Sequence, residues 1–341
     1  MKNALGLMPQ AAARAPASAA RFLQPARSGD LKLSLALQGG GAHGAFTWGV
    51  LERLLEEDQL DIRALSGTSA GALNAVALAS GWCQAGRAGA RASLARLWQT
   101  VTREAAGSPL RYGGLAPLAL GLMTYLFSPR ELNPLDINPM RRLLEELVDF
   151  DALRRCRPMP ILIAATNVRT GEGRIFREHE LTADMVLASA CLPQLHHTVE
   201  IEGEPYWDGG FVSNPPVLPL ATLGRSRTLL VVRINPTAAQ AMPRSAAAIR
   251  NRANEVVFGQ PLANELRQLE AIRRFGRNPL SLLQPQLRRL ARLDLQVIDG
   301  DETLASLDPL TKVAPTVTLV EGLREEGRAA AEAWLRARDR A

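Results

Sequence analysis

The sequence predicts an α/β fold, a mainly parallel sheet flanked by helices, with a helical extension at its C-terminal end. The order strand, glycine-rich turn, helix occurs twice between residues 31 and 79, which is typical of parallel strands joined by crossover helices. The chain has 341 residues, of which 47% are apolar, enough to fill the core of one large domain or two ordinary ones. This composition excludes intrinsic disorder for most of the chain.

Each of the two units begins with a short apolar strand and continues through a glycine turn into a helix. In the first strand the leucines occupy alternate positions and therefore one face. In the first helix, apolar residues recur at helical spacing until an acidic end at Glu56-Glu57-Asp58. We expect strands over 31–37 and 62–65, turns over 39–41 and 67–71, and helices over 46–58 and 72–79.

The rest of the chain changes character after residue 235, where it becomes rich in arginine, alanine and leucine. We expect a disordered basic tail over 1–30, an α/β domain over 31–235 and a helical extension over 236–341 that packs on it. Further strands are predicted at 161–165, 198–201, 229–234 and 295–298, and further helices at 183–190 and 320–337.

Positive charge is concentrated in one region. The chain carries 40 basic and 34 acidic residues, a net charge of +6, and residues 244–292 hold ten arginines against three glutamates, a local net of +7. An anionic membrane or a lipid-coated particle could bind this region, and a solvated helical face is the plainer interpretation. Few aromatic residues interleave the arginines, so we expect no nucleic-acid partner.

Three features of the sequence bear on the cellular location of the protein: its first residues, one uncharged stretch and its cysteines. The first 30 residues contain no apolar run of the length that a secretory signal needs. The uncharged stretch 112–129 is interrupted by glycine and proline, so it is a poor membrane span and is either a buried segment or an apolar lip that touches lipid. Cys83, Cys156 and Cys191 are odd in number and widely spaced, which predicts buried thiols in a reducing compartment. We expect a cytoplasmic protein with possible peripheral membrane contact.

The pattern Gly67-x-Ser69-x-Gly71 lies between a predicted strand and a predicted helix. A nucleophilic serine needs its hydroxyl raised on a sharp turn, and flanking glycines let the neighbouring backbone pass without a Cβ clash. The N-terminal amides of the following helix would stabilise negative charge that develops there. An unreactive glycine-serine turn has the same pattern.

The glycine loop Gly39-Gly40-Gly41-Ala42-His43-Gly44 also lies between a strand and a helix. Its amides could converge on a phosphate or on the oxyanion of a tetrahedral intermediate. Gly39, Gly41 and Gly44 match G-x-G-x-x-G, but a dinucleotide site would need an acid at the end of the second strand, and Asp61 precedes that strand. An oxyanion hole is the better hypothesis.

Asp208 lies in Trp207-Asp208-Gly209-Gly210, which is followed by Asn214-Pro215-Pro216. A glycine turn can hold a carboxylate rigidly, as a general base or as an ordinary Asx turn. The glycine loop, G-x-S-x-G and D-G-G in this order resemble the patatin-like phospholipase family over residues 31–235. The resemblance implies that Ser69 is the nucleophile, Asp208 its base, and the Gly39–Gly41 loop the oxyanion hole.

The resemblance further implies hydrolysis of a lipid ester through an acyl-enzyme. We expect neither a metal nor an organic cofactor, since no cluster of Cys, His or carboxylates has ligand spacing. His43 departs from the family pattern, because many members have arginine there, which leaves headgroup preference and pH dependence open. A Ser-His-Asp triad with His196 or His197 is an alternative, although in that chain order the histidine comes late. Polyester depolymerisation, acyl transfer and a non-catalytic coat on a membrane or storage granule are also compatible with the sequence.

Overall fold

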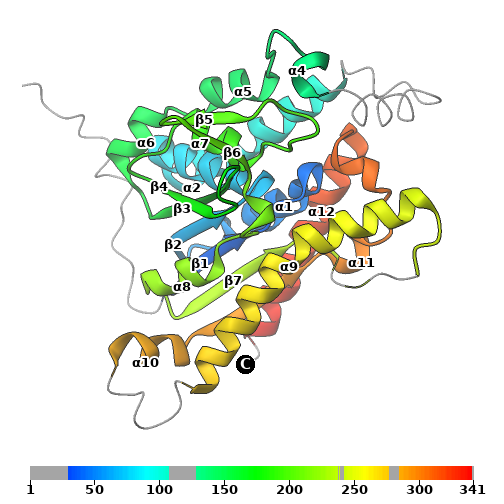
Figure 1. The fold of residues 1–341 in the computed structure, drawn as a ribbon. Helices are drawn as coiled ribbons and strands as arrows, with labels where there is room; N and C mark the ends of the chain where they lie inside the picture. Colours follow the sequence, from blue (N-terminus) through cyan, green and yellow to red (C-terminus); the bar gives the residue numbers. More distant parts are fainter. Residues whose placement is uncertain (1–29, 107–127, 237, 239–241, 276–283, 340–341) are drawn as a thin grey trace, which may run out of the picture.

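The computed structural model describes residues 30–106, 128–236, 238, 242–275 and 284–339, and its centre is one eight-stranded sheet (Figure 1). The strand order is β5-β6-β3-β2-β1-β7-β8, and β4 pairs with β3. Neighbours from β3 to β8 along this order are parallel, whereas β4 and β6 run antiparallel to β3. The predicted mainly parallel sheet is confirmed. The strands are β1 (Leu31–Leu37), β2 (Leu60–Gly67), β3 (Ile161–Asn167), β4 (Gly173–Arg177), β5 (Val199–Ile201), β6 (Glu204–Asp208), β7 (Thr228–Arg233) and β8 (Asp294–Asp299).

Helices cover both faces of the sheet (Figure 1). The alternating residues of β1 show the division: Leu33, Leu35 and Leu37 belong to the apolar cluster that includes α1 and α2, while Ala36 belongs to the cluster that includes α8 and α9. The described helices are α1 (Gly44–Leu54), α2 (Ala70–Ala106), α4 (Pro129–Leu132), α5 (Pro139–Leu147), α6 (Phe150–Cys156), α7 (Ala183–Ser189), α8 (Val217–Leu223), α9 (Ala246–Phe275), α10 (Pro285–Ala291), α11 (Asp301–Leu304) and α12 (Val317–Asp339), with short 3₁₀ turns η2 (Gly41–His43), η4 (Gly209–Phe211) and η6 (Pro309–Lys312).

The C-terminal part of the chain is built into the sheet. The strand predicted at 295–298 is confirmed as β8, which pairs in parallel with β7. The last helix, α12, packs on α1 at a close crossing: a Cβ on Gly49 would lie 1.9 Å from the Arg324 carbonyl oxygen, and one on Gly327 would lie 2.0 Å from that of Phe46. Residues 236–341 are therefore not purely helical, since they complete one edge of the sheet.

Several elements differ from the sequence-based expectation. The helix expected over 72–79 extends from Ala70 to Ala106, and Ala85 and Gly86 form a kink inside it. The sequence pattern does not predict the short strands β4 and β6, because neither shows a clear apolar alternation; their residues are only half-buried on average. The tail and most of the uncharged stretch at 112–129 lie outside the described residues.

The prediction for the cysteines is wrong in two of three cases. Cys83 and Cys156 form a disulfide, with 6.1 Å between their Cα atoms and 73 residues between them in sequence. It joins α2 to α6, a contact that cysteine spacing cannot reveal. Cys191 is free and buried, as expected. The cysteines thus no longer support a reducing compartment. No helix in the described part of the chain is long and apolar enough to span a membrane.

Candidate active site

Ser69 lies at the sharp turn between β2 and α2. Its φ is +55°, in the left-handed region that residues other than glycine rarely occupy. The flanking glycines are required by close approaches: a Cβ on Gly67 would lie 2.5 Å from the Gly71 carbonyl oxygen, and one on Gly71 would lie 2.0 Å from that of Leu37. The G-x-S-x-G pattern thus reflects a compressed turn that holds the half-buried Ser69 at the carboxyl edge of the sheet.

Two hydrogen bonds from distant segments hold this turn. The Ser69 amide donates to the Ser189 hydroxyl at 3.0 Å, and the Thr68 hydroxyl donates to the Ser213 carbonyl oxygen at 2.8 Å. Ser189 is the last residue of α7 and is fully buried. Nothing in the local sequence around Ser189 indicates this contact, because it depends on how α7 packs against the turn.

Asp208 is the last residue of β6 and lies beside Ser69. Its pairing with Ala165 of β3 places it at the same edge of the sheet as the nucleophile turn. The Gly210 amide donates to its Oδ1 at 2.7 Å, and the Ser69 hydroxyl is near enough to lower the pKa of the Asp208 carboxyl. A Cβ on Gly209 would lie 2.1 Å from the Ala164 carbonyl oxygen, which explains the D-G-G pattern.

The carboxyl group of Asp208 is buried, with 1% of the residue exposed. Burial raises the pKa of Asp208 to about 7, while the hydrogen bonds from the Gly210 amide and the Ser69 hydroxyl act in the opposite direction. A carboxylate of ordinary pKa is a weak base at neutral pH, whereas one with a pKa near 7 can accept a proton and return it. The environment therefore suits Asp208 to general-base chemistry.

The glycine loop lies directly against Ser69. A Cβ on Gly39 would lie 2.8 Å from the Ser69 Cβ. The Gly39 amide donates to Asn214 Oδ1 at 2.7 Å, and the Asn235 Nδ2 donates to the Gly39 carbonyl oxygen at 2.6 Å. The amide of Gly39 is therefore already in use. Among the described residues, no acceptor is bonded to the amides of Gly40 and Gly41, which remain available for an oxyanion.

His43 lies at the start of α1 with 1% of the residue exposed. Its Nε2 forms a 2.8 Å hydrogen bond with the Thr311 hydroxyl in η6. Burial, together with the charge of Lys312, lowers the pKa of His43 to about 4, so the imidazole is neutral at physiological pH. Where many family members have a permanent charge, this chain therefore has a neutral group bonded to its C-terminal part.

His196 and His197, the alternative candidates for a base, follow α7. His197 contacts the Pro129 carbonyl oxygen at 3.1 Å and the Asp136 carboxylate at 3.7 Å. His196 is exposed. No hydrogen bond among the described residues joins either histidine to Ser69 or Asp208. The geometry favours the two-residue arrangement.

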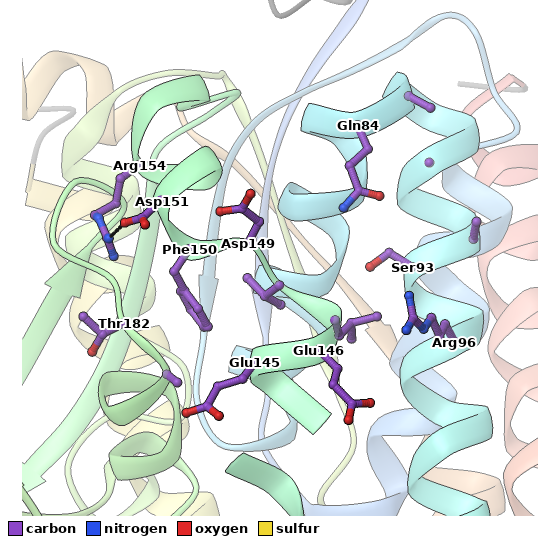
Figure 2. A pocket seen from close by; sticks show the side chains of 16 residues that line it. Gln84, Ser93, Arg96, Glu145, Glu146, Asp149, Phe150, Asp151, Arg154 and Thr182 are labelled. Carbon is purple, nitrogen blue, oxygen red and sulfur yellow. Dashed lines mark hydrogen bonds and ion pairs between the residues drawn. The ribbon is translucent and has the colours of Figure 1, made fainter. Parts of the chain in front are cut away.

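A cavity of about 810 Å³ lies between α2, α5 and α6 (Figure 2). Two of its carboxylates have structural partners: Asp149 accepts from the Ala152 amide at 2.8 Å and caps α6, and Asp151 pairs with Arg154. Neither Ser69 nor Asp208 lines it. Within the described ranges, no group of three His, Cys, Asp or Glu residues is arranged to hold a metal ion.

A comparison with protein families decides the classification of this site. The model described as patatin-like phospholipase matches residues 35–221, which is more than half of the chain. The chain belongs to the patatin-like phospholipase family. The matched range includes the glycine loop, the nucleophile turn and the D-G-G turn, so all three predicted motifs lie within the family domain.

The solved structures that match this chain include two of low identity. VipD from Legionella pneumophila is 15% identical with a TM-score of 0.43, and the match covers 89% of this chain and 66% of VipD. The second is the heterodimeric complex ExoU-SpcU from the type III secretion system of Pseudomonas aeruginosa, 18% identical with a TM-score of 0.29, covering 92% of this chain and 61% of that chain. The chain thus spans less than two thirds of either match. No match was found among curated proteins.

Proposed function

We propose that the protein hydrolyses ester bonds of lipids through an acyl-enzyme on Ser69. Membership of the patatin-like phospholipase family supports lipid acyl hydrolase activity, and the site supplies the chemical groups. The observation that carries the proposal is the placement of the strained Ser69 beside the buried Asp208 carboxyl, with the amides of Gly40 and Gly41 unoccupied next to them. A non-catalytic coat protein has no need for this combination.

In the first half of the reaction, the Ser69 Oγ attacks the ester carbonyl carbon while the Asp208 carboxylate accepts the hydroxyl proton. The carbonyl oxygen becomes an oxyanion, to which the amides of Gly40 and Gly41 donate hydrogen bonds. The tetrahedral intermediate then collapses, the carbon–oxygen bond to the alcohol breaks, and the departing alkoxide takes the proton from Asp208. The acyl group remains on Ser69.

In the second half, water replaces the alcohol. Asp208 accepts a proton from the attacking water, the same amides stabilise the second oxyanion, and the proton returns to the Ser69 Oγ as the fatty acid leaves. No oxidant, reductant or metal is needed to balance the two halves. Acyl transfer to another alcohol and cleavage of a polyester would use the same steps.

The proposal is tested with purified protein against phospholipids, lysophospholipids, acylglycerols and polyhydroxyalkanoate, with Ser69→Ala as the blank. We expect a fluorophosphonate probe to label the wild type and not Ser69→Ala, and we expect release of fatty acid from at least one lipid ester. Hydrolysis that persists in Ser69→Ala, or a wild type that neither reacts with the probe nor cleaves any ester, would refute the proposal. Preferential cleavage of the polyester would identify the polyester as the substrate instead.

A further inference from the structure

Lys312, at the end of η6, contacts the glycine loop from the C-terminal part of the chain. A Cβ on Gly41 would lie 2.3 Å from the Lys312 carbonyl oxygen, so the two backbones are in close contact. The Lys312 Nζ donates to Asn235 Oδ1 at 2.9 Å, and the Asn235 Nδ2 donates to the Gly39 carbonyl oxygen at 2.6 Å. A chain of hydrogen bonds thus leads from the ammonium group to the loop.

The hydrogen bond from Asn235 to Gly39 determines the direction in which the Gly40 N–H points. The carbonyl group of Gly39 and the N–H of Gly40 belong to one planar trans peptide, so they point in opposite directions. When Asn235 holds the carbonyl oxygen, it also fixes the N–H on the other side. That N–H is one of the two amides that have no acceptor among the described residues.

Asn235 is held in place by its own hydrogen bonds, so it can transmit the effect of the Lys312 charge to the Gly39–Gly40 peptide. The Gln38 Oε1 accepts both the Ile234 amide at 2.8 Å and the Asn235 amide at 2.9 Å, and Asn235 is buried. Hydrogen bonds in series polarise one another, and a charged donor strengthens the next bond. The Lys312 ammonium therefore makes the Asn235 amide a stronger donor, which in turn makes the Gly40 N–H a stronger donor.

The charges around Lys312 make it the local source of positive potential. Its neighbour His43 is neutral at physiological pH because burial and Lys312 itself lower its pKa to about 4. Burial lowers the pKa of Lys312, and the carboxylate of Glu255 in α9 acts in the opposite direction; Glu255 is also bonded to Arg252 at 3.0 Å. Of the 40 basic residues only three are lysines, Lys2, Lys32 and Lys312, so the chain strongly prefers arginine. The half-buried position 312 departs from that preference. An ammonium is a compact charge that suits a single amide oxygen.

We propose that Lys312 is a positioning residue for the oxyanion hole, whose charge acts through Asn235 and the Gly39–Gly40 peptide on the Gly40 N–H. The inference rests on the proposed function, in which that N–H binds the oxyanion. Because full negative charge on the carbonyl oxygen exists only near the transition state, Lys312 contributes to kcat and little to KM.

The test uses Lys312→Met, with Lys32→Met as the matched control, because Lys32 is exposed at the start of β1, far from the loop. Removing a direct oxyanion donor costs about 10²–10³ in kcat, so for an indirect effect we expect a loss of roughly tenfold in Lys312→Met with unchanged KM. A trifluoromethyl ketone, which forms an oxyanion on Ser69, should bind more weakly by the same factor. Lys32→Met should change none of these values.

The outcomes separate this inference from the proposed function. If the wild type hydrolyses a soluble ester and Lys312→Met keeps its kcat and ketone affinity, the role of Lys312 is refuted while the function stands. A rise in KM alone would also refute it, since Lys312 would then bind the ground state. A wild type without hydrolysis or probe labelling would overturn both. If Lys312→Met does not fold, Lys312→Gln, which keeps a donor without the charge, is measured with the same expectations.

Discussion

Ser69 has a strained backbone conformation, and the neighbouring Asp208 has a buried carboxyl group. A positive φ at a residue other than glycine costs about 1–3 kcal/mol, and a fully buried carboxylate costs further stability whenever it is ionised. Both residues lie at the same edge of the sheet. The Ser189 hydroxyl accepts a hydrogen bond from the Ser69 amide, and the Gly210 amide donates one to the Asp208 carboxylate, which partly offsets these two costs. Such a concentration is expected where chemistry, rather than stability, has determined the residues.

The first prediction concerns the two residues as a unit. Ser69→Ala and Asp208→Asn should each abolish turnover of a soluble ester, and the double variant should be no slower than either, because residues that act in one step are not additive. Rates are measured at equal concentrations of folded protein, checked by circular dichroism. Substantial activity in Asp208→Asn, combined with its loss in His196→Ala or His197→Ala, would replace the dyad with a histidine base.

The second prediction follows from the raised pKa of Asp208. The base must be ionised to act, so kcat/KM should rise with pH and level off above about 7, the pKa that burial gives Asp208. Stability should show the opposite trend. The folded state binds the Asp208 proton more tightly than the unfolded state, whose carboxyl has a pKa near 3.8, so stability is lost as pH rises from about 4 to about 7.

Asp208→Asn removes this cost. Its melting temperature should exceed that of the wild type at pH 8, where the cost reaches up to about 4 kcal/mol for a shift of this size, and should approach the wild-type value at pH 4. Thermal unfolding at both pH values measures the difference. Equal melting temperatures at pH 8 would show that Asp208 is not buried as a charge.

At the scale of elements, the glycine loop joins the end of β1 to the start of α1 and depends on the strand beside it. A Cβ on Gly40 would lie 3.0 Å from the Ile234 Cδ1 and 3.3 Å from the Asn235 Oδ1. Gly40→Val should therefore displace the peptide that carries the oxyanion donor and lower kcat by about 10² or more, with a smaller effect on KM. Gly322→Val in α12, where a Cβ would meet nothing within 4 Å, is the matched control. A change confined to KM would mean that the loop binds the ground-state substrate.

The pairing of α1 with α12 offers a prediction about stability. Arg324 of α12 donates to both carboxylate oxygens of Glu52 in α1, at 2.8 and 3.1 Å, and Glu52 is buried. Arg324→Ala would leave the buried carboxylate paired only with Arg328, at 3.2 Å, which should cost about 1–3 kcal/mol of unfolding free energy. Arg336→Ala, which removes an exposed pair with Glu332 in the same helix, should cost less than about 1 kcal/mol. Unfolding free energies are measured in urea. If Arg324→Ala and Arg336→Ala lose similar amounts of unfolding free energy, the ion pair between Arg324 and Glu52 does not contribute specially to the α1–α12 pairing.

For the whole molecule, the sequence is informative wherever a pattern is local. Alternating leucines predict β1, and the three glycine motifs predict the residues that meet at the site, because each turn needs its glycines for close approaches. Ser189, Asn235 and Lys312 could not be predicted, since each acts through a contact between segments far apart in the chain. The disulfide between Cys83 and Cys156 belongs to the same class, because it depends on how α2 packs against α6.

Helix α9, which carries part of the basic region 244–292, contacts the D-G-G turn of the site. Phe258 of α9 packs on the D-G-G turn: its carbonyl oxygen accepts from Asn214 Nδ2 at 2.9 Å, and a Cβ on Gly210 would lie 2.5 Å from its ring. In the same half of the helix, Ile249 and Val256 are seven residues apart and exposed, which puts both on one face. Exposed apolar side chains with arginines nearby are the features of a peripheral contact with an anionic lipid surface.

The last prediction is that the half of α9 nearest the site binds anionic vesicles. Arg244, just before α9, and Arg250 in its first turns are exposed, and each basic residue contributes about 1 kcal/mol near such a surface. Arg244→Gln/Arg250→Gln should therefore weaken binding about thirtyfold at low salt and flatten its salt dependence. Arg267→Gln/Arg274→Gln, in the distal half of α9, is the matched control. Hydrolysis of a soluble short-chain ester should stay unchanged in both variants, because none of these side chains contacts the catalytic loops among the described residues. Co-sedimentation with phosphatidylserine vesicles at low and high salt measures the effect. If both double variants sediment like the wild type, the arginines of α9 are an ordinary solvated face and lipid reaches Ser69 without their help.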